Sequence, residues 1–509
     1  MQLLLLVAVI TELSAVVTET EQWDPAGDQT LLFKNKTNGP IGMLTTSGGA
    51  PVSYEDATNT LNTPLIHNEF FMDTITHRVR ENIPPRPVHA KGTGAFGYFE
   101  VTHDISHVCK AAFLKKIGTK TPVAVRFSTG EGERGSSDLN RDSRGFAVKF
   151  YTEEGNLDLL GFHTPVYPYK DPLNAGTRWH GTKRNPASNL YDFNTYWDVV
   201  TLIPEMINFY LLLYSDGGIP ASYRNMPGYP IHTYQVENEN GDEHFVRFHI
   251  LPDAGIKNLR SEEARNLSAI DPDYLRRDLY RAIGNGDFPS WTVSVQILST
   301  ADVNKVGSQV FDVTRTIPLK EFPLHPIGKI VVNRNAKNFF AEIEQLAFCP
   351  ANLVPGILGA PDKLFEARRL AYRDSHLYRL GANVKKIPVN CPFQTKTFTY
   401  LRDGVPPVGN NEEDAPNYYP NSFNGPVPYM PKHKSALINI VEGKADNFDQ
   451  AAEFYANELT NDERTRLIEN LVLPLQNVHK FIQERAINIF TTIHPDLGNR
   501  LAQALNSAS

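Results

Sequence analysis

Residues 90–335 contain short segments in which apolar side chains recur at every second position. In the segment TPVAVRFST, Val123, Val125 and Phe127 share one face, and the segments RGFAVKFYT and SWTVSVQILS repeat this period of two. A period of two is typical of β-strands, because successive side chains point to opposite faces of a sheet. A series of such strands predicts an antiparallel barrel with helical insertions.

Local signals predict a hairpin and a helix. In the segment HTYQVENENGDEHFVRFHIL, the dipeptide Asn240-Gly241 predicts the turn between two strands. In PDKLFEARRLAY, Pro361 and Asp362 mark the expected start of a helix.

The parts on either side of the strand-rich region have other patterns. Residues 20–85 show little sustained periodicity and predict an extended arm, with one helix around Glu69–Arg80. Residues 336–440 are rich in proline and predict irregular chain around the helix that starts near Asp362. The C-terminal part is helical in pattern, and Thr460 with Glu463 predicts a capping box.

Composition excludes several classes of protein. The chain has 509 residues, enough for one large core or for two to three domains, and its content of 41% hydrophobic and 21% charged residues is typical of a soluble globular protein. The net charge of −7 argues against nucleic-acid binding, which needs a basic surface. The apolar run Leu3–Ile10 is too short to cross a bilayer, and we expect no membrane span elsewhere.

The N-terminus predicts a signal peptide over residues 1–20, with cleavage near Ala15–Thr18. Sequons at Asn35 and Asn266 are compatible with secretion. The basic residues that usually open a signal peptide are missing, so a hydrophobic cytosolic arm is the alternative. The C-terminus, ALNSAS, is not a peroxisomal address.

Three cysteines, Cys109, Cys349 and Cys391, are too few and too scattered for a disulfide framework or a zinc site. We expect three buried thiols. One bridge with a leftover thiol is the alternative.

Four longer segments carry a family resemblance. They are RPVHAKGTGAFGYFEVTHD, VRFSTGEGERGSSDLNRDSRGFAVKFY, RRLAYRDSHLYRLGANVKKIPVNCPF and APNYYPNSF. Together they resemble the haem-containing catalases, from about residue 40 to 425 and more weakly to the end of the chain.

This resemblance implies an α+β catalase fold with an eight-stranded antiparallel β-barrel, an extended N-terminal arm, a wrapping segment and a C-terminal helical domain. The expected parts are an arm over residues 21–88, a barrel that binds haem over 89–335, a wrapping segment with the proximal haem helix over 336–445, and the helical domain over 446–509. Family members are tetramers with exchanged arms, which implies a homotetramer here.

The resemblance assigns the haem-binding residues. Tyr372 matches the tyrosine that ligates the haem iron in catalases. Arg368 lies four residues earlier on the same predicted helix, and a cation there favours the phenolate form that the iron needs. His376 shares that face. Three arginines match the residues that bind the haem propionates: Arg86, Arg126 and Arg379. In the interior of a strand, Arg126 would be a buried charge that requires a partner.

The resemblance also assigns the distal side, where hydrogen peroxide binds. His89 matches the histidine that takes a proton from one peroxide oxygen and returns it to the other. Ser128 matches the serine that orients this imidazole, and Val88 matches the apolar residue that narrows the approach.

One distal residue departs from the family. Catalases carry Gly-Asn-Asn-Thr-Pro where this chain has Gly161-Phe162-His163-Thr164-Pro165, so Phe162 replaces the asparagine that donates a hydrogen bond to peroxide. Phenylalanine has no donor. We do not expect His163 to replace it, because neighbouring side chains in extended backbone point to opposite faces.

Other positions depart as well. The following residues replace aromatic or basic family residues near the distal pocket: Tyr167, Pro168, Lys170, Ala175 and Arg178. Asn208, Gly217 and Leu251 stand where some catalases have the His, Arg and Lys of a regulatory nucleotide site, so NADPH is not expected.

Three functions remain open at this point. The first is a catalase-family haem protein with weakened hydrogen-peroxide turnover or slow peroxidase chemistry. The second is an ordinary catalase that tolerates Phe162. The third is a non-enzymatic relative that binds haem or only keeps the fold.

Overall fold

The structure, a computed structural model, describes residues 24–61, 64–406, 409–433, 435–443 and 445–508, so the predicted signal peptide lies outside the described residues. The chain divides into two compact units. The first unit holds the residues up to Asn82 together with Tyr280–Asn285, and the second holds Ile83–Leu279 and the chain from Gly286 onward.

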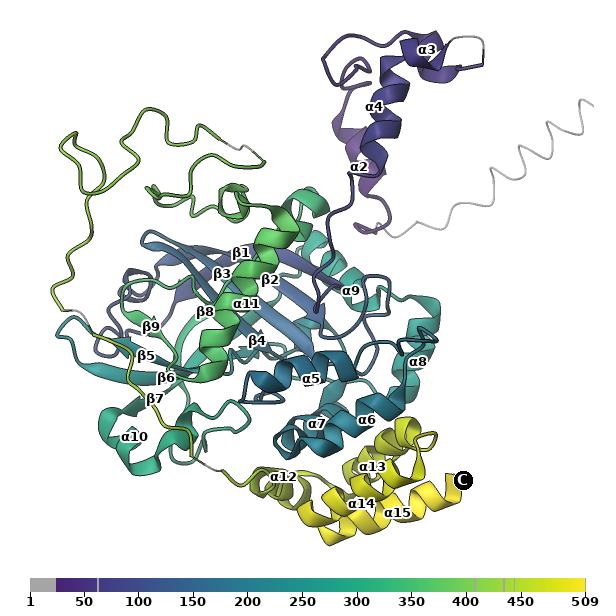
Figure 1. Ribbon diagram of the computed structural model, residues 1–509, viewed down its shortest axis with the longest axis vertical. Helices are drawn as coiled ribbons and strands as arrows, with labels where there is room; N and C mark the ends of the chain where they lie inside the picture. The colour runs from purple at the N-terminus through teal and green to yellow at the C-terminus, as the bar shows by residue number, and fades with distance from the viewer. Residues whose placement is uncertain (1–23, 62–63, 407–408, 434, 444, 509) are drawn as a thin grey trace, which may run out of the picture. The chain divides into compact units, whose positions relative to one another are not determined.

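The second unit is built on one curled antiparallel sheet (Figure 1). Its strand order is β4-β3-β2-β1-β8-β7-β6-β5-β9. The strands are β1 (Gly92–Val101), β2 (Lys120–Thr129), β3 (Arg144–Thr152), β4 (Gly155–Phe162), β5 (Thr233–Glu237), β6 (Glu243–Pro252), β7 (Ser290–Ser299), β8 (His325–Asn335) and β9 (Ile357–Gly359). The eight expected strands are thus confirmed, and a short ninth strand pairs with β5 at the edge.

Both faces of the central strands are buried. On β2, Val125 and Phe127 are buried on one face, and Ala124 and Arg126 are buried on the other. Helix α11 (Lys363–Leu380) lies over the face that carries Ala124, and Leu380 belongs to the same apolar cluster (Figure 1). The alternation of β2 therefore separates an inner aromatic core from a surface that a helix covers.

Aromatic rings fill the inside of the curled sheet. Phe127 stacks on Tyr223 with 5.0 Å between ring centroids, and Phe146 packs edge-on against Trp291 at 5.5 Å. The indole N–H of Trp291 donates to the carbonyl oxygen of Met226 over 3.0 Å. Large rings in these geometries remove much apolar surface from water and fix the curvature of the sheet around them.

The predicted hairpin and helix start are confirmed. Strands β5 and β6 pair antiparallel across a turn in which Gly241 has a φ of +89°, a value that glycine adopts readily. The Asp362 carboxylate accepts the Phe365 amide at the start of α11, so it caps that helix.

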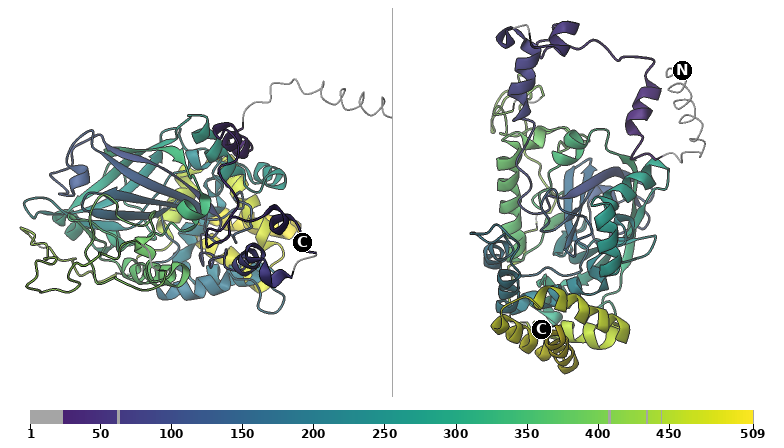
Figure 2. Two further views of the ribbon diagram at one scale, coloured as in Figure 1. Left: turned by 90° about the horizontal axis from the view of Figure 1, so that it is seen from above. Right: turned by 90° about the vertical axis from the view of Figure 1, so that its right-hand side faces the viewer.

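The C-terminal helices pack against the helices that follow β4. The first of these groups contains α12 (Asp449–Glu453), η9 (Phe454–Glu458), α13 (Asn461–Leu475), α14 (Lys480–Ile493) and α15 (Pro495–Ala508). The second contains α5 (Leu173–Gly181), α6 (Phe193–Leu202) and α7 (Ile207–Tyr214). One apolar cluster spans both groups, and the C-terminal helices form a single layer (Figure 2). Thr460 and Glu463 form the predicted capping box of α13.

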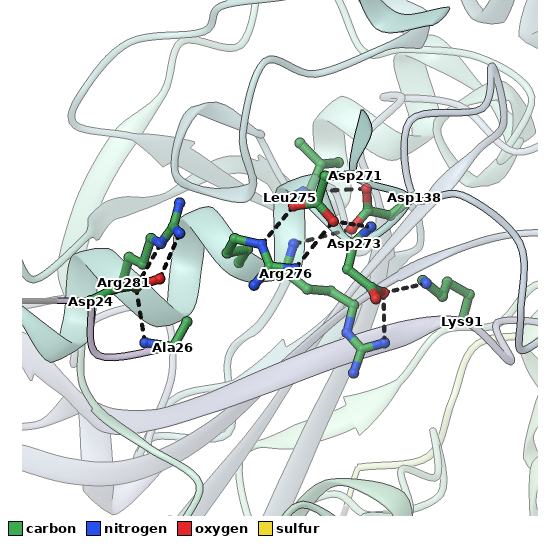
Figure 3. Close-up of polar contacts among 10 residues, drawn as sticks. Asp24, Ala26, Lys91, Asp138, Asp271, Asp273, Leu275, Arg276 and Arg281 are labelled. Atoms are coloured by element: carbon green, nitrogen blue, oxygen red, sulfur yellow. Dashed lines mark hydrogen bonds and ion pairs between the residues drawn. The ribbon is translucent and has the colours of Figure 1, made fainter. Parts of the chain in front are cut away.

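The remaining helices of the second unit are short. They are η2 (Ala112–Leu114), η3 (Pro204–Met206), η4 (Asp216–Gly218), η5 (Tyr223–Asn225), α8 (Ser261–Ile270), α10 (Thr300–Val306), η6 (Ser308–Phe311), the π-helix η7 (Phe340–Glu344) and η8 (Val384–Lys386). Helix α9 (Tyr274–Gly284) begins in this unit. The Asp138 carboxylate accepts the amides of Leu275 and Arg276 in the first turn of α9 (Figure 3).

The first unit is made of short helices: α2 (Gln29–Lys36), α3 (Tyr54–Thr58), η1 (Leu65–His67) and α4 (Glu69–Arg78). None of their described residues is buried within the chain. The helix predicted around Glu69–Arg80 is confirmed as α4, whereas α2 and α3 gave no periodic signal because they have no apolar face to bury. An ion pair joins Asp24 to Arg281 over 2.6 Å within this unit (Figure 3).

The three cysteines are free thiols. Cys109 and Cys349 are buried as expected, but the prediction of burial is wrong for Cys391, which is half-buried at the end of a turn. In the described part of the chain, no helix combines the length and apolarity that a membrane crossing requires.

The corner after β4 is closed by His163. The His163 amide donates to the Arg144 carbonyl over 2.9 Å, and the Arg144 amide donates to His163 Nδ1 over 2.9 Å. Burial and the cationic Arg144 side chain lower the pKa of His163 to about 3. The imidazole is therefore neutral, and its Nδ1 accepts a hydrogen bond from the backbone amide of Arg144, the first residue of β3.

This geometry predicts a pH effect of His163 on stability. The histidine pKa of an unfolded chain is about 6.5, so the unfolded state binds one more proton than the folded state below that pH. Folded stability falls as the pH drops from about 6.5 towards 3, by up to about 1.4 kcal/mol per pH unit for this group. We expect His163→Asn, which keeps an acceptor but cannot be protonated, to melt with a shallower pH dependence between pH 6 and pH 4.

Melting temperatures measured against pH test this expectation. The exposed His103→Asn serves as the matched control and should follow the wild type. Equal pH dependence in His163→Asn and the wild type would contradict a buried, neutral His163.

Candidate functional site

Two arginines converge on one turn of the chain. Arg86 Nη2 donates to the carbonyl oxygens of Ile343, Glu344 and Leu346 over 3.0, 3.0 and 2.8 Å. Arg379, near the end of α11, donates through Nη2 to the Glu344 carboxylate over 2.9 Å. Both guanidinium groups are buried. The π-helix η7 thus presents its carbonyl groups and one carboxylate to two buried cations.

Arg126 joins this cluster from the middle of β2. It is buried, and its Nη2 donates to the carbonyl oxygen of His89 over 2.8 Å. Gly92 makes room for it, because a Cβ at that position would lie 2.7 Å from Nη2. The sequence placed Arg126 in a strand interior as a charge that needs a partner, and this hydrogen bond satisfies only part of the guanidinium.

The cluster is short of negative charge. Glu344 is the carboxylate that lowers the cost of burying all three arginines. Arg86 Nη1, Arg126 Nε, and Nε and Nη1 of Arg379 are buried without a hydrogen-bond partner. Burial and the neighbouring cations lower the pKa of Arg86, and burial lowers the pKa of Arg126 to about 10. Unpaired buried donors of this kind are costly unless an anion binds them, so the residues fit the two carboxylates of a haem.

A polar chain leads from the N-terminus of α11 to Tyr372. The Asp362 carboxylate lies 2.9 Å from His232 Nδ1, and His232 Nε2 lies 2.7 Å from Arg368 Nη1. Arg368 Nη2 donates to the Tyr372 hydroxyl over 3.4 Å. Burial lowers the pKa of His232, and Asp362 opposes that shift. A neutral His232 that donates from Nδ1 and accepts at Nε2 holds the Arg368 cation against Tyr372.

His376 lies one turn after Tyr372 on α11, as the spacing predicts. The two rings are 6.3 Å apart, and His376 Nε2 lies 2.9 Å from the Phe348 carbonyl oxygen. Its Nδ1 is buried without a hydrogen-bond partner. Burial and the charge of Arg86 lower the pKa of His376 to about 3, so the ring is neutral.

His89 is held in an uncommon backbone conformation. Its φ is +61°, in the left-handed region that few residues other than glycine adopt. The His89 amide donates to the Gly130 carbonyl over 2.8 Å, and Nδ1 lies 3.0 Å from Ser128 Oγ. Gly145 on β3 makes room for this pair, because a Cβ there would lie 2.9 Å from His89 Nδ1. Strained positions of this kind cluster at functional sites.

The electrostatic surroundings keep His89 neutral. Burial and the nearby charges of Arg126 and Arg368 lower the pKa of His89 to about 3. Because Ser128 pairs with Nδ1, the Nε2 nitrogen is the one that can exchange a proton with a bound substrate. The preceding Val88 is half-buried.

Phe162 lies in the pocket of His89. It is the last residue of β4 and pairs in register with Gly145. Its ring packs edge-on against the His89 ring with 5.5 Å between centroids, and it is 7% exposed. His163 points instead into the β3 backbone, in agreement with the expectation that it does not replace the missing donor.

The other residues that differ from the family near the distal pocket make contacts of their own. Tyr167 packs edge-on against Phe162 at 5.2 Å, and Lys170 pairs with Asp312 over 2.9 Å. Arg178, buried on α5, forms an ion pair with the half-buried Glu131. Pro168 is buried, and Ala175 packs against the cluster that joins α5–α7 to the C-terminal helices.

Sequence reasoning missed three acidic or basic partners in this site. Glu344, His232 and Glu131 lie far along the chain from the arginines that they contact, and no local motif marks them. Asp362 was expected only as a helix cap. Its second carboxylate oxygen lies against His232, which is a tertiary contact that the sequence does not encode locally.

Comparisons with known proteins agree with this geometry. The family model described as Catalase matches residues 45–425, and the model described as Catalase-related immune-responsive matches residues 441–505. The chain is 44% identical over 497 residues to a catalase of Drosophila melanogaster, and the alignment covers 95% of this chain and 98% of that catalase. It is 45% identical over 495 residues to a catalase of Cavia porcellus, with 95% and 94% covered.

Solved structures give the same result. A fungal catalase matches with a TM-score of 0.87 and 37% identity, over 92% of this chain and 98% of that one. Catalase A from Saccharomyces cerevisiae matches with a TM-score of 0.86 and 39% identity, over 91% and 99%. Family models over most of the chain, relatives above 40% identity and the shared architecture lead to one conclusion: this chain belongs to the catalase family.

Proposed function

We propose that this chain is a haem protein that acts on hydrogen peroxide with a turnover that Phe162 lowers. The observation that carries the proposal is the contact between the Phe162 and His89 rings, because it puts an apolar ring with no donor beside the residue proposed as the acid–base group. The arginine cluster and the Arg368–Tyr372 contact support an intact haem-binding side.

The residues that would hold the haem act in two groups. Tyr372 would supply the axial oxygen, with Arg368 stabilising its anionic form. Arg86, Arg126 and Arg379 would bind the propionates through their unpaired donors. A bound haem supplies the iron redox chemistry by which one peroxide is reduced and another is oxidised.

His89 would move the peroxide protons. Its neutral imidazole can accept a proton at Nε2 from one peroxide oxygen and return it to the other, which releases water. Ser128 holds the ring in place through Nδ1, and the Gly130 and Arg126 contacts fix its backbone. Preorganisation of this kind lets proton transfer proceed without rearrangement of the site.

Phe162 would remove one positioned donor. By analogy with the loss of one oxyanion-hole donor, this raises the barrier by about 2.7–4 kcal/mol. The ring also fills space in the pocket of His89. Slow turnover leaves time for single-electron reactions with organic donors, so weak peroxidase chemistry belongs to the same proposal.

Haem binding through Tyr372 is the first expected outcome. Full-length protein should take up haem and show the absorption spectrum of five-coordinate ferric haem with a tyrosinate ligand. Tyr372→Phe removes only the ligating oxygen, so this spectrum should be lost. Tyr378→Phe, on the exposed side of the same helix, is the control and should keep it. Protein that stays colourless after haem reconstitution would favour a structural relative instead.

Phe162→Asn should raise peroxide turnover. The restored donor contributes about 2.7–4 kcal/mol, or about two to three powers of ten in rate. Oxygen evolution at matched haem content is the measurement. Phe162→Leu, which frees space without adding a donor, separates the two effects of the ring.

His89→Ala in the Phe162→Asn protein should abolish the gain, because base and donor act on the same peroxide. A wild type that already evolves oxygen as fast as an ordinary catalase would contradict the proposed role of Phe162 and favour the second function.

We also propose that the chain is exported and assembles as a homotetramer. The leader-like start and the exposure of both sequon asparagines, Asn35 on α2 and Asn266 on α8, support export. The unburied apolar residues of the first unit support assembly with further copies. NADPH is not expected, because Asn208, Gly217 and Leu251 offer no cation to its phosphates.

N-terminal sequencing of the native protein tests export. We expect a new terminus near residues 16–20, and a loss of mass after glycosidase treatment. An intact Met1 without glycan would make residues 1–20 a cytosolic arm.

A further inference from the structure

A row of aromatic rings leaves the pocket of Phe162. The Tyr167 ring packs edge-on against Phe162 at 5.2 Å and against Tyr169 at 4.9 Å. The two tyrosine hydroxyls lie 3.3 Å apart. The Arg368 guanidinium, which contacts Tyr372, also lies 5.8 Å from the centre of the Tyr167 ring. Tyr167 therefore borders the pocket of Phe162 and shares the Arg368 cation as a neighbour with Tyr372, the proposed haem ligand.

The row continues through the helical core. Tyr169 is buried in the apolar cluster that also contains Tyr210 and Trp197. The Tyr210 ring lies 5.6 Å from Tyr196, and Tyr196 lies 5.8 Å from Trp197. These are ring contacts between side chains that are among the most easily oxidised in proteins.

Arg178 interacts electrostatically with tyrosines of both halves of the row. Burial alone would lower the pKa of Arg178, but Glu131 and the hydroxyl groups of Tyr210 and Tyr169 outweigh burial and raise this pKa well above its usual value. Arg178 and Glu131 also form an ion pair in which the arginine is buried. Tyr169, at the pocket end, and Tyr210, at the far end, thus interact electrostatically with the same guanidinium and belong to the same apolar cluster.

The row reaches solvent at Tyr196. This residue is half-buried on α6, while Tyr167 is half-buried at the pocket and Tyr169 and Tyr210 are buried between them. The Tyr196 ring lies 6.3 Å from Phe193, which is 49% exposed. An aromatic donor molecule could contact Tyr196 there without entering the pocket of His89.

Oxidation of a tyrosine releases its phenolic proton, so the row needs a base. Glu131 forms an ion pair with Arg178 and interacts electrostatically with Tyr210, Tyr196 and Tyr214. Burial raises the pKa of Glu131 to about 6, although Arg178 opposes that shift. A carboxylate of this kind can take up and release a proton near neutral pH.

We propose that Tyr167, Tyr169, Tyr210 and Tyr196 form a relay that carries single oxidising equivalents from the haem pocket to the surface, where a phenolic donor is oxidised. The relay rests on the proposed function, because peroxide is the oxidant and the haem transmits its oxidising power. One peroxide accepts two electrons and two protons and gives two waters. Two phenol molecules supply them and become two phenoxyl radicals, so atoms and electrons balance.

The relay also explains why a phenylalanine stands at position 162. Catalase turnover needs a second peroxide as the reductant in the pocket, and the Phe162 ring occupies space there. The nearest reducing side chain in contact with that ring is Tyr167. Because this pocket oxidises the second peroxide slowly and contacts a tyrosine, that tyrosine is oxidised instead and passes the oxidising equivalent towards the surface.

Radical trapping on the haem-loaded full chain tests the relay. The protein is treated with hydrogen peroxide and a nitroso spin trap, and the adduct is located by peptide mass spectrometry. We expect an adduct on Tyr196. Tyr169→Phe keeps the ring but removes the oxidisable hydroxyl, so it should abolish the Tyr196 adduct while Tyr167 remains trapped.

Two controls define the result. Tyr223→Phe changes a buried tyrosine of the barrel core, outside the relay, and should leave the Tyr196 adduct unchanged. Tyr196→Phe should reduce phenol oxidation at unchanged oxygen evolution. Protein without haem should give no adduct.

The outcomes separate the relay from the proposed function. Haem-loaded protein whose spectrum responds to peroxide, but which gives no Tyr196 adduct, overturns the relay and leaves the proposed function standing. An adduct that persists in Tyr169→Phe, or that forms without haem, also overturns the relay. A protein that binds no haem overturns both.

Discussion

The burial of three guanidinium groups around a single carboxylate constrains the rest of the structure. Arg86, Arg126 and Arg379 come from the start of the second unit, from β2 and from α11, and Glu344 lies on the π-helix η7. Buried charges are tolerated only with partners, so these four segments must meet in one arrangement. The carbonyl groups of residues 343–346 satisfy part of that need. The donors left unpaired are what a haem would complete, so the same constraint shapes both fold and site.

The two sides of the site differ in character. On the proximal side, Asp362, His232, Arg368 and Tyr372 form a continuous polar chain in which each group has a partner. On the distal side, His89 keeps its supports but faces the apolar ring of Phe162. The residues proposed to bind the cofactor and those proposed to handle peroxide are different, so one set can change while the other is kept.

The distal change is not a simple loss of polar groups. Arg178 stands where the resemblance implies an aromatic residue and forms an ion pair with the half-buried Glu131, and Tyr167 carries a hydroxyl where the resemblance implies a phenylalanine. A buried ion pair rarely adds net stability, because desolvation offsets its attraction. The Arg178–Glu131 pair is therefore weak evidence for added stability.

Sequence alone determined several strands, one turn and the starts of two helices, and it identified most of the charged and aromatic residues of the site. The period of two in β2 and β3, the Asn240-Gly241 turn and the capping box of α13 are local signals, and all of them appear in the structure. The positions of His89, Tyr372 and the arginines follow from long motifs. These signals can be read from the sequence because strand pleat, turn geometry and helix capping depend on residues that are close in sequence.

Only the tertiary structure decided which groups meet. Glu344 beside three arginines, His232 behind Arg368, and Glu131 beside Arg178 each join segments that are distant in the chain. The burial of both faces of β2 also depends on α11, which lies more than two hundred residues away. Such contacts follow from how a curled sheet and its helices pack in space, and no local pattern of residues records that packing.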